Sequence, residues 1–230
     1  MSGKNLVLIV AGGNGARMNS STPKQYMKIG KKSVLLMTIE AFLKSKEVHF
    51  LRVVISNSHI KMYQNISSRI NDKRLLPFAI GGRNRTESVS NGLKSFNNIL
   101  FSRADKILIH DAARPFVSQD LITRLFSELD SAEAVFPRIP ISDALWYKHQ
   151  NSYRKGPNRD LLFRAQTPQG FYFNQIKKLY KDDNETHLDD ISIAQSHKLR
   201  ISGILGDPMN IKLTNPEDLI FAEKVSKIWM

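Results

Sequence analysis

An apolar run rich in β-branched residues meets a glycine-rich turn in KNLVLIVAGGNGARM, Lys4 to Met18. Such a run predicts a buried strand, and glycines at its end let backbone N–H groups come close to a ligand because glycine has no Cβ. Clustered amides attract anions, and Arg17 and Lys24 add two positive charges beside them. The segment therefore predicts a strand whose end offers what a polyphosphate needs.

Two common phosphate-binding patterns do not match this loop. The Walker A pattern requires a lysine directly after its second glycine, and no lysine follows Gly15. The dinucleotide pattern fails because Met18 stands where its third glycine belongs. A purely structural turn is the alternative. The cations favour the anion site, because positive charge is costly to gather where no anion is bound.

Positive charge dominates the composition. The 230 residues include 34 Lys and Arg against 21 Asp and Glu, a net charge of +13. This balance suits nucleic acid, an acidic membrane surface or phosphorylated small molecules, and a solvated basic surface is the alternative for most lysines. The absence of cysteine excludes disulfides and thiolate metal sites. The N-terminal apolar run is too short for a signal peptide or a membrane span, which predicts a soluble, cytoplasmic protein without a membrane partner.

Apolar strands alternate with amphipathic helices along most of the chain. We expect helices over 34–44, 59–70, 86–100, 118–129, 174–180, 189–196 and 216–228. We expect strands over 6–10, 51–56, 76–80, 106–110, 200–205 and 211–213, and another that starts at 134. This alternation with short loops predicts an α/β fold whose parallel sheet has helices on both faces. No linker or repeat interrupts it, so residues 1–230 are expected to form a single domain.

The alternation fails over 138–166, which is interpreted as a projecting β-arm. Its sequence suggests two extended stretches joined by a turn at Gly156 and Pro157. Apolar side chains on such an arm, among them Trp146 and Tyr147, need a partner surface. A hairpin folded back on its own domain is the alternative.

Chemistry-bearing residues follow the carboxyl ends of the expected strands, where ligands of open parallel sheets collect. They are Gly12 to Arg17, Gly81, Gly82, Arg85, Ser88, Asp111 to Arg114, Asp143 and Lys212. Asp111 suits hydrogen bonds from a substrate hydroxyl or a share in holding a divalent ion. An N-cap or an ion pair with Arg114 is its structural alternative. His110 is expected to pack at its strand end.

Eight motifs occur in order between Ala11 and Leu219: AGGNGARM, PKQY, GGRNRTESVSNGL, HDAARPF, PISD, RAQTPQGF, LDD and NIKLTNPEDL. In content, order and spacing the chain resembles the 2-C-methyl-D-erythritol 4-phosphate cytidylyltransferase family. The resemblance implies a Rossmann-like fold and a homodimer whose arms embrace the partner. It also implies a nucleotidyltransferase of isoprenoid precursor synthesis, the methylerythritol phosphate pathway. CTP and the sugar-alcohol phosphate give a CDP-alcohol and pyrophosphate, with Mg²⁺ or another divalent cation.

The resemblance also implies roles for single residues. Arg17 and Lys24 would hold the triphosphate and the charge that builds at the α-phosphorus, and Lys212 would join them as a catalytic cation. The nucleotide would be bound by Ala11, Gly12, Gly13, Gly15, Gly82, Ser88 and Ala112. The acceptor phosphate would be bound by Asp111, Arg159 and Lys212, with Arg159 reaching the neighbouring subunit's site. The triphosphate would provide most of the ligands of the metal ion, with Asp111 as a possible further ligand.

The chemistry of the residues agrees with these roles. A phosphate monoester is already a nucleophile at neutral pH, so the reaction needs positioning and charge stabilisation rather than a Ser–His pair. Three residues depart from the family's pattern. Ala144 and Leu188 stand where a threonine is usual, and Arg83 stands where an acidic or small residue is common. These departures bear on the affinity and identity of the acceptor.

Three alternatives remain open from the sequence. Ribitol-5-phosphate cytidylyltransferases share the CTP site, although HDAARP and AQTPQGF favour the methylerythritol phosphate family. A basic nucleic-acid-binding module lacks support, because no RNP stretch, zinc pattern or helix-turn-helix signature occurs. A degenerate homologue kept as a binding protein has Ala144 and Leu188 in its favour and the site cations against it.

Overall fold

A computed structural model describes residues 3–13, 18, 20, 22–96, 101–182 and 187–229. Its central sheet has eight strands. Six are parallel to one another: β1 (Asn5–Ala11), β4 (Phe50–Ile55), β5 (Ala79–Ile80), β6 (Lys106–Asp111), β7 (Ala134–Pro140) and β12 (Ile201–Leu205). Two are antiparallel to their neighbours: β10 (Phe163–Ala165) and β11 (Gln169–Tyr172). The order is β10-β7-β11-β6-β1-β4-β5, with β12 paired to β7.

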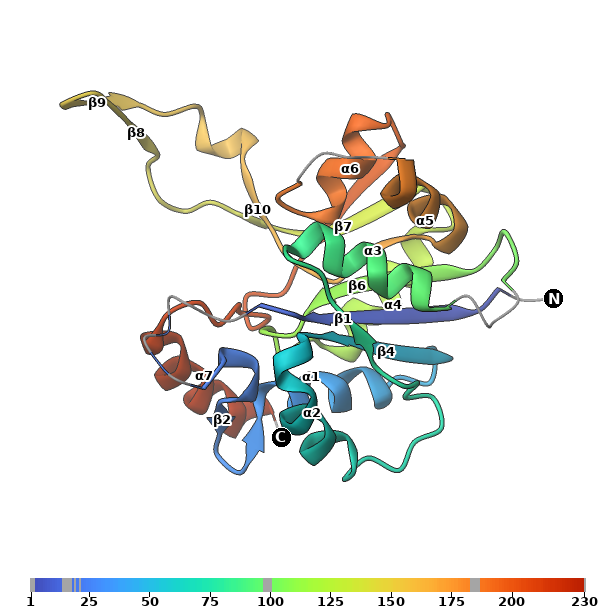
Figure 1. Ribbon diagram of the computed structural model, residues 1–230. Helices are drawn as coiled ribbons and strands as arrows, with labels where there is room; N and C mark the ends of the chain where they lie inside the picture. The colour runs from blue at the N-terminus through green and yellow to red at the C-terminus, as the bar shows by residue number, and fades with distance from the viewer. Residues whose placement is uncertain are drawn as a thin grey trace.

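Helices cover both faces of this sheet (Figure 1). One face carries α1 (Val34–Leu43), α2 (Ile60–Ser67) and α4 (Gln119–Glu128), and the other carries α3 (Arg85–Ser95), α5 (Phe173–Asp182) and α6 (Asp190–Ser196). In β1, Val7 and Ile9 pack toward the first group and Leu6 and Leu8 toward the second. This two-sided burial explains the uninterrupted apolar run, because a strand with helices on both faces has no solvated side. The predicted α/β fold is confirmed.

Shorter elements complete the chain. The helix α7 (Pro216–Trp229) packs on a third cluster that includes Phe116 and Leu213. Two small antiparallel pairs lie outside the main sheet: β2 (Lys28–Ile29) with β3 (Lys32–Ser33), and β8 (Trp146–His149) with β9 (Ser152–Lys155). The 3₁₀ helices are η2 (Lys24–Tyr26), η3 (Asn57–His59) and η5 (Arg159–Leu161).

Helix starts follow the expected capping chemistry. The side chain of Ser118 accepts the N–H of Leu121 at 3.3 Å, as an N-cap residue should. Pro216 is the first residue of α7, where its fixed φ and missing N–H cost nothing. The predicted helix over 59–70 is shorter than expected, because η3 precedes α2 and α2 ends at Ser67. The last predicted turn of the helix over 86–100 lies largely outside the described residues.

Two strand predictions are wrong in detail, and one strand was missed. The strand expected over 76–80 is confined to β5, because Pro77 has no N–H to continue the ladder that Leu76 begins with Leu51. Residues 211–213 form no strand; Leu213 makes a single backbone hydrogen bond to Ala113. The strand β11 was not predicted, since four residues are too short for a clear period.

The arm projects away from the sheet (Figure 1). Its root is the pairing of β7 with β10, and β8 and β9 form a hairpin at its tip. The predicted turn at Gly156 and Pro157 is wrong, because the hairpin turns at Gln150 and Asn151. Gly156 instead closes the hairpin's base by donating its N–H to Leu145 at 2.7 Å, where a Cβ would lie 2.6 Å from that carbonyl oxygen.

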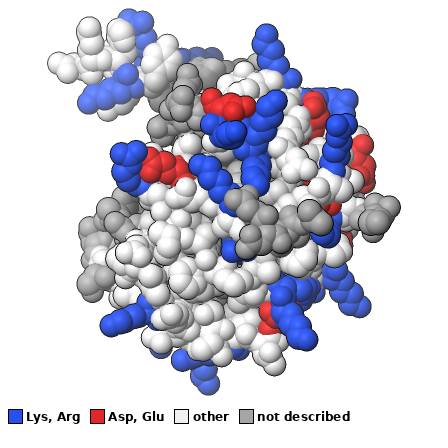
Figure 2. Space-filling model, turned by 45° about the vertical axis from the view of Figure 1, so that its right-hand side comes forward, with Lys and Arg blue, Asp and Glu red and all other residues white. Residues whose placement is uncertain are grey.

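Lys and Arg side chains are scattered over the surface in Figure 2, including the arm, and form no single continuous block on this face. The sequence agrees, because it contains no block of five or six like charges. Within the described ranges, no helix is long and apolar enough to cross a membrane.

Candidate active site

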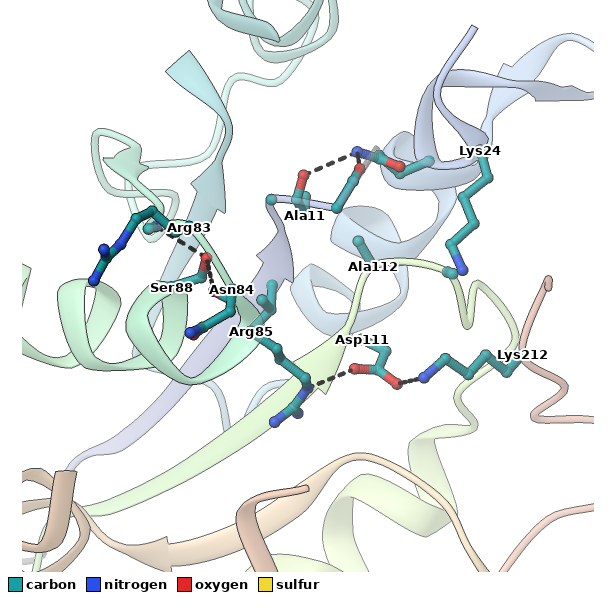
Figure 3. A pocket seen from close by; sticks show the side chains of 15 residues that line it. Ala11, Lys24, Arg83, Asn84, Arg85, Ser88, Asp111, Ala112 and Lys212 are labelled. Carbon is teal, nitrogen blue, oxygen red and sulfur yellow. Dashed lines mark hydrogen bonds and ion pairs between the residues drawn. The ribbon is translucent and has the colours of Figure 1, made fainter. Parts of the chain in front are cut away.

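A pocket of about 270 Å³ lies at the carboxyl ends of β1, β5 and β6 (Figure 3). Its lining includes most of the residues expected to bind ligands: Ala11, Gly12, Gly13, Lys24, Gly82, Ser88, Asp111, Ala112 and Lys212. Arg159 does not line it, because η5 belongs to the projecting arm. Arg17 and Gly15 lie outside the described residues. The tertiary structure thus brings nine of the expected residues to one cavity.

Gln25, which no sequence motif marks as a site residue, fixes the first loop. Its buried side-chain amide donates to the carbonyl oxygens of Ala11 at 2.9 Å and Gly13 at 2.8 Å. These two bonds hold the end of β1 against η2. Lys24, the preceding residue, is half-buried and donates from Nζ to the carbonyl oxygen of Leu213 at 3.0 Å. The amine is therefore held at the pocket, next to the segment that carries Lys212.

The loop between β5 and α3 is held by its own side chains. The hydroxyl of Ser88 accepts the N–H of Gly82 at 3.0 Å and donates to the carbonyl oxygen of Asn84 at 2.8 Å. The carboxylate of Glu87 accepts the N–H of Arg83 at 2.9 Å. A Cβ at Gly82 would lie 2.3 Å from that of Glu87, so this position requires glycine. Ser88 therefore shapes the pocket wall as well as lining it.

Asp111 lies at the end of β6 among three cations. Its carboxylate oxygens lie 2.7 Å from Lys212 Nζ, 3.5 Å from Arg85 Nε and 3.9 Å from Arg114 Nε. Burial alone would raise the pKa of Asp111, but Arg85, Lys212 and Arg114 together hold it below its usual range. The carboxylate is therefore ionised throughout the physiological range and suits accepting hydrogen bonds from hydroxyl groups.

His110 precedes Asp111 in β6 and is fully buried. Its Nε2 bonds to the carbonyl oxygen of Arg114 at 2.9 Å, an acceptor, so Nε2 carries the proton. The Thr167 hydroxyl, which accepts the N–H of Asp111 at 3.1 Å, then donates to Nδ1 at 3.2 Å. Burial lowers the pKa of His110 to about 4. His110 is thus a neutral packing residue against Phe42, in agreement with the prediction.

The residues present do not build a cation site by themselves. In the parts of the chain that the structure describes, no group of three or more His, Cys, Asp or Glu residues is placed to hold a metal ion. Asp111 is the one carboxylate among the described residues lining the pocket, and its oxygens already face three cations. The donor set therefore suits an anionic ligand rather than a free divalent cation.

The three departures from the family's pattern take different positions. Arg83 lines the pocket but points its guanidinium outward, pairing with Glu87 at 2.6 Å with 91% of its side chain exposed. Ala144 lies on the arm and shares a hollow of about 590 Å³ with Arg159. Leu188 is 96% exposed just before α6. The pocket around Lys24 is thus unaffected by Ala144 and Leu188.

A mostly parallel sheet with a cationic, glycine-lined pocket at its carboxyl edge is typical of α/β enzymes that bind phosphorylated ligands. A sequence model of the family described as 2-C-methyl-D-erythritol 4-phosphate cytidylyltransferase matches residues 5–227. The chain belongs to this family.

Individual relatives agree. The chain is 33% identical over 223 residues to 2-C-methyl-D-erythritol 4-phosphate cytidylyltransferase of Clostridioides difficile, covering 95% of this chain and 92% of that protein. It is 38% identical over 218 residues to the bifunctional enzyme IspD/IspF of Wolbachia pipientis, covering 94% of this chain and 54% of that protein. The chain therefore spans about half the length of the bifunctional relative.

Solved structures share the fold. The 4-diphosphocytidyl-2C-methyl-D-erythritol synthase of Anaerococcus prevotii superposes with a TM-score of 0.83 at 25% identity, covering 98% of this chain and 96% of that one. The 2-C-methyl-D-erythritol 4-phosphate cytidylyltransferase of Francisella tularensis gives a TM-score of 0.79 at 26% identity, covering 96% and 99%. Nearly the whole architecture of this chain is thus shared with these two proteins.

Proposed function

We propose that the chain transfers the cytidylyl group of CTP to 2-C-methyl-D-erythritol 4-phosphate and releases pyrophosphate. The observation that carries the proposal is the convergence of Lys24, Lys212 and the ionised Asp111 beside the glycine loop of β1. The two lysines suit the triphosphate of CTP and the phosphate of the acceptor. The carboxylate suits the hydroxyl groups of a sugar alcohol. The names of the relatives favour methylerythritol phosphate over a pentitol phosphate as the acceptor.

The reaction joins two polyanions and needs no protein nucleophile. An oxygen of the acceptor phosphate attacks the α-phosphorus of CTP, the new P–O bond forms, and the bond to the β-phosphate breaks as pyrophosphate leaves. The contribution of the protein is alignment and charge stabilisation. Lys24 supports the transition state because its ammonium is held at the pocket by the Leu213 carbonyl. Arg17 joins it in this role by resemblance to the family.

The remaining site residues divide between the two substrates. We assign the nucleotide to the backbone of Ala11, Gly12, Gly13 and Gly15 and to the wall made by Gly82, Ser88 and Ala112. Asp111 accepts hydrogen bonds from acceptor hydroxyls, and Lys212 faces the acceptor phosphate. Asp111 would hold a divalent cation only weakly, because Arg85, Lys212 and Arg114 already face its carboxylate. Mg²⁺ bound to the nucleotide would supply extra neutralisation of phosphate charge.

The glycine positions allow a sharp test of the nucleotide assignment. No described atom lies within 4 Å of where a Cβ at Gly13 would stand, whereas a Cβ at Gly82 would clash with Glu87. Gly13→Ala is therefore expected to leave the melting temperature unchanged and raise the KM for CTP about tenfold, by keeping the phosphates from the backbone. Gly82→Ala, in contrast, is expected to lower the free energy of unfolding by about 1–3 kcal/mol. A Gly13→Ala enzyme with the wild-type KM for CTP would contradict the assignment.

We propose that the chain is a single domain, residues 1–230, that acts as a homodimer through the arm, residues 138–166. The exposed aromatic side chains of Trp146, Tyr147 and Tyr153 lie on the projecting hairpin and need a covering surface. Arg159 lies on the same arm, beside Ala144 and outside the pocket of its own chain. The dimer therefore lets Arg159 bind the acceptor phosphate in the neighbouring subunit's site.

Subunit mixing tests this arrangement. Arg159→Ala and Lys24→Ala homodimers are each expected to be nearly inactive, because every site in them lacks one group. Random exchange makes half of the dimers mixed, and each mixed dimer keeps one intact site. Activity is therefore expected to recover to about a quarter of the wild-type value. Exchange is verified with two affinity tags. Mixed dimers without recovered activity would show that Arg159 does not serve the partner's site.

Pyrophosphate release tests the function itself. CTP, ATP, GTP and UTP are each offered with methylerythritol phosphate or ribitol 5-phosphate, with and without Mg²⁺. We expect pyrophosphate release with CTP, methylerythritol phosphate and Mg²⁺. The other product is expected to carry the α-phosphate of CTP joined to the acceptor phosphate. Preference for ribitol 5-phosphate would identify the pentitol alternative. Absence of release with every pair, together with tight and salt-sensitive binding to generic DNA, would support the nucleic-acid-binding alternative.

A further inference from the structure

Arg85 links the pocket to a buried carboxylate that does not line it. From the first position of α3, its guanidinium donates to both carboxylate oxygens of Asp190, at 2.9 and 2.7 Å. The same guanidinium lies 3.5 Å, through Nε, from a carboxylate oxygen of Asp111 (Figure 3). One planar guanidinium therefore bridges a carboxylate that lines the pocket and an interior one.

Asp190 is a rigid anchor for this bridge. It is fully buried as the first residue of α6, and its side chain also accepts the hydroxyl hydrogen of Tyr180. Its backbone N–H donates to Gln169 Oε1 at 2.9 Å. Four elements thus fix this residue: α3 and α5 through its carboxylate, β11 through its backbone, and α6, which carries it. A bidentate arginine pair has little orientational freedom, so the anchor also fixes the guanidinium plane.

The three cations around Asp111 differ in how firmly they are held. The side chain of Lys212 is 40% exposed, and those of Arg85 and Arg114 are 26% and 10% exposed. Arg114 is tied to Asn210 by its guanidinium at 2.8 Å and lies farthest from the carboxylate. Lys212 is thus the cation most free to turn toward an incoming phosphate. Of the two arginines that remain beside Asp111, Arg85 lies nearer to its carboxylate.

We propose that Arg85 is a positioning residue that holds Asp111 in place for the acceptor when Lys212 turns from Asp111 to the acceptor phosphate. This inference rests on the proposed function, because it takes Asp111 and Lys212 to be acceptor-binding. Arg85 itself acts through Asp111, with its orientation set by Asp190. The charged groups that face Asp111 are Arg85 of α3, Lys212 and Arg114, and the preceding residue, His110, is neutral.

The test removes the bridge without leaving a lone buried charge. The double variant R85Q/D190N replaces both members of the buried pair with neutral groups of similar shape. Asp190→Asn alone keeps the arginine but weakens its anchor, and Arg85→Lys keeps the charge but loses the bidentate geometry. The matched control is R124Q/D120N on α4, a pair at 2.7 Å that does not line the pocket. The measurements are kcat, the KM for each substrate and the melting temperature of the full-length protein.

We expect R85Q/D190N to raise the KM for methylerythritol phosphate about tenfold while the KM for CTP changes less than about twofold. Arg85→Lys and Asp190→Asn are expected to give smaller rises in the same parameter. The control pair is expected to change neither KM.

Two results would overturn the inference. One is an unchanged acceptor KM in R85Q/D190N with a native melting temperature. The other is an equal rise in both KM values, which indicates a general structural role. If the double variant does not fold, the same two comparisons of KM values and melting temperature are made with Asp190→Asn. Wild-type enzyme that fails to transfer the cytidylyl group refutes the proposed function instead, so the two failures are distinguishable.

Discussion

Lys24→Ala is expected to lower turnover about 100- to 1000-fold while the protein remains folded. A preorganised cation that meets developing phosphate charge contributes on this scale, by analogy with a single oxyanion donor. The stability cost is small, because the substitution removes a hydrogen bond from a half-buried lysine to Leu213. About 1 kcal/mol corresponds to a fall of about 2–4 °C in melting temperature for a chain of this size. Steady-state turnover and a thermal melt on one preparation measure both effects.

The matched control is Lys31→Ala in the same stretch of chain. Lys31 is exposed in the turn between β2 and β3, and it does not line the pocket. Its removal takes away one positive charge without touching the site, so turnover is expected to stay at the wild-type level. A Lys24→Ala enzyme that keeps wild-type turnover would remove Lys24 from the catalytic machinery. Equal losses in both variants would indicate a general effect of net charge.

Arg85→Gln alone is expected to lower the free energy of unfolding by about 3–5 kcal/mol, more than any other substitution proposed for this protein. The substitution leaves Asp190 without its cation in a fully buried position, where an unpaired carboxylate is costly. At this chain length the melting temperature is expected to fall by roughly 10 °C. The loss depends on folding rather than on substrates, so a thermal or urea melt of the ligand-free protein measures it.

Restoring charge balance provides the control for this prediction. Adding Asp190→Asn to Arg85→Gln is expected to recover most of the lost melting temperature, because the stranded carboxylate is then removed. The pairwise effect is obtained from the two single variants and the double. If the double variant is less stable than Arg85→Gln alone, the loss comes from packing around Arg85 and not from the buried charge of Asp190.

Local patterns along the chain were enough to predict the alternating elements and the caps. The apolar run of β1, the N-cap Ser118 and the helix that starts at Pro216 each depend on a few neighbouring residues. The antiparallel β11 could not be predicted in this way. Its first three residues, Gln169 to Phe171, are buried because β6 and β7 lie on either side, and their positions are set by distant parts of the chain. The prediction of the turn of the arm was wrong for a related reason. Gly156 is needed at the base of the hairpin, where it meets Leu145, and not in the turn.

The sequence by itself determined the class of the site: a glycine loop after β1, cations in the PKQY and NIKL segments, and a carboxylate at the end of β6. The reason is that parallel strands bring their carboxyl ends to one edge, so residues after them converge. Only the tertiary structure decided how these groups are paired. The Gln25 clamp on β1 and the Arg85 bridge from Asp111 to Asp190 join segments up to 105 positions apart. Such contacts depend on helix placement over the sheet, which local periodicity does not encode.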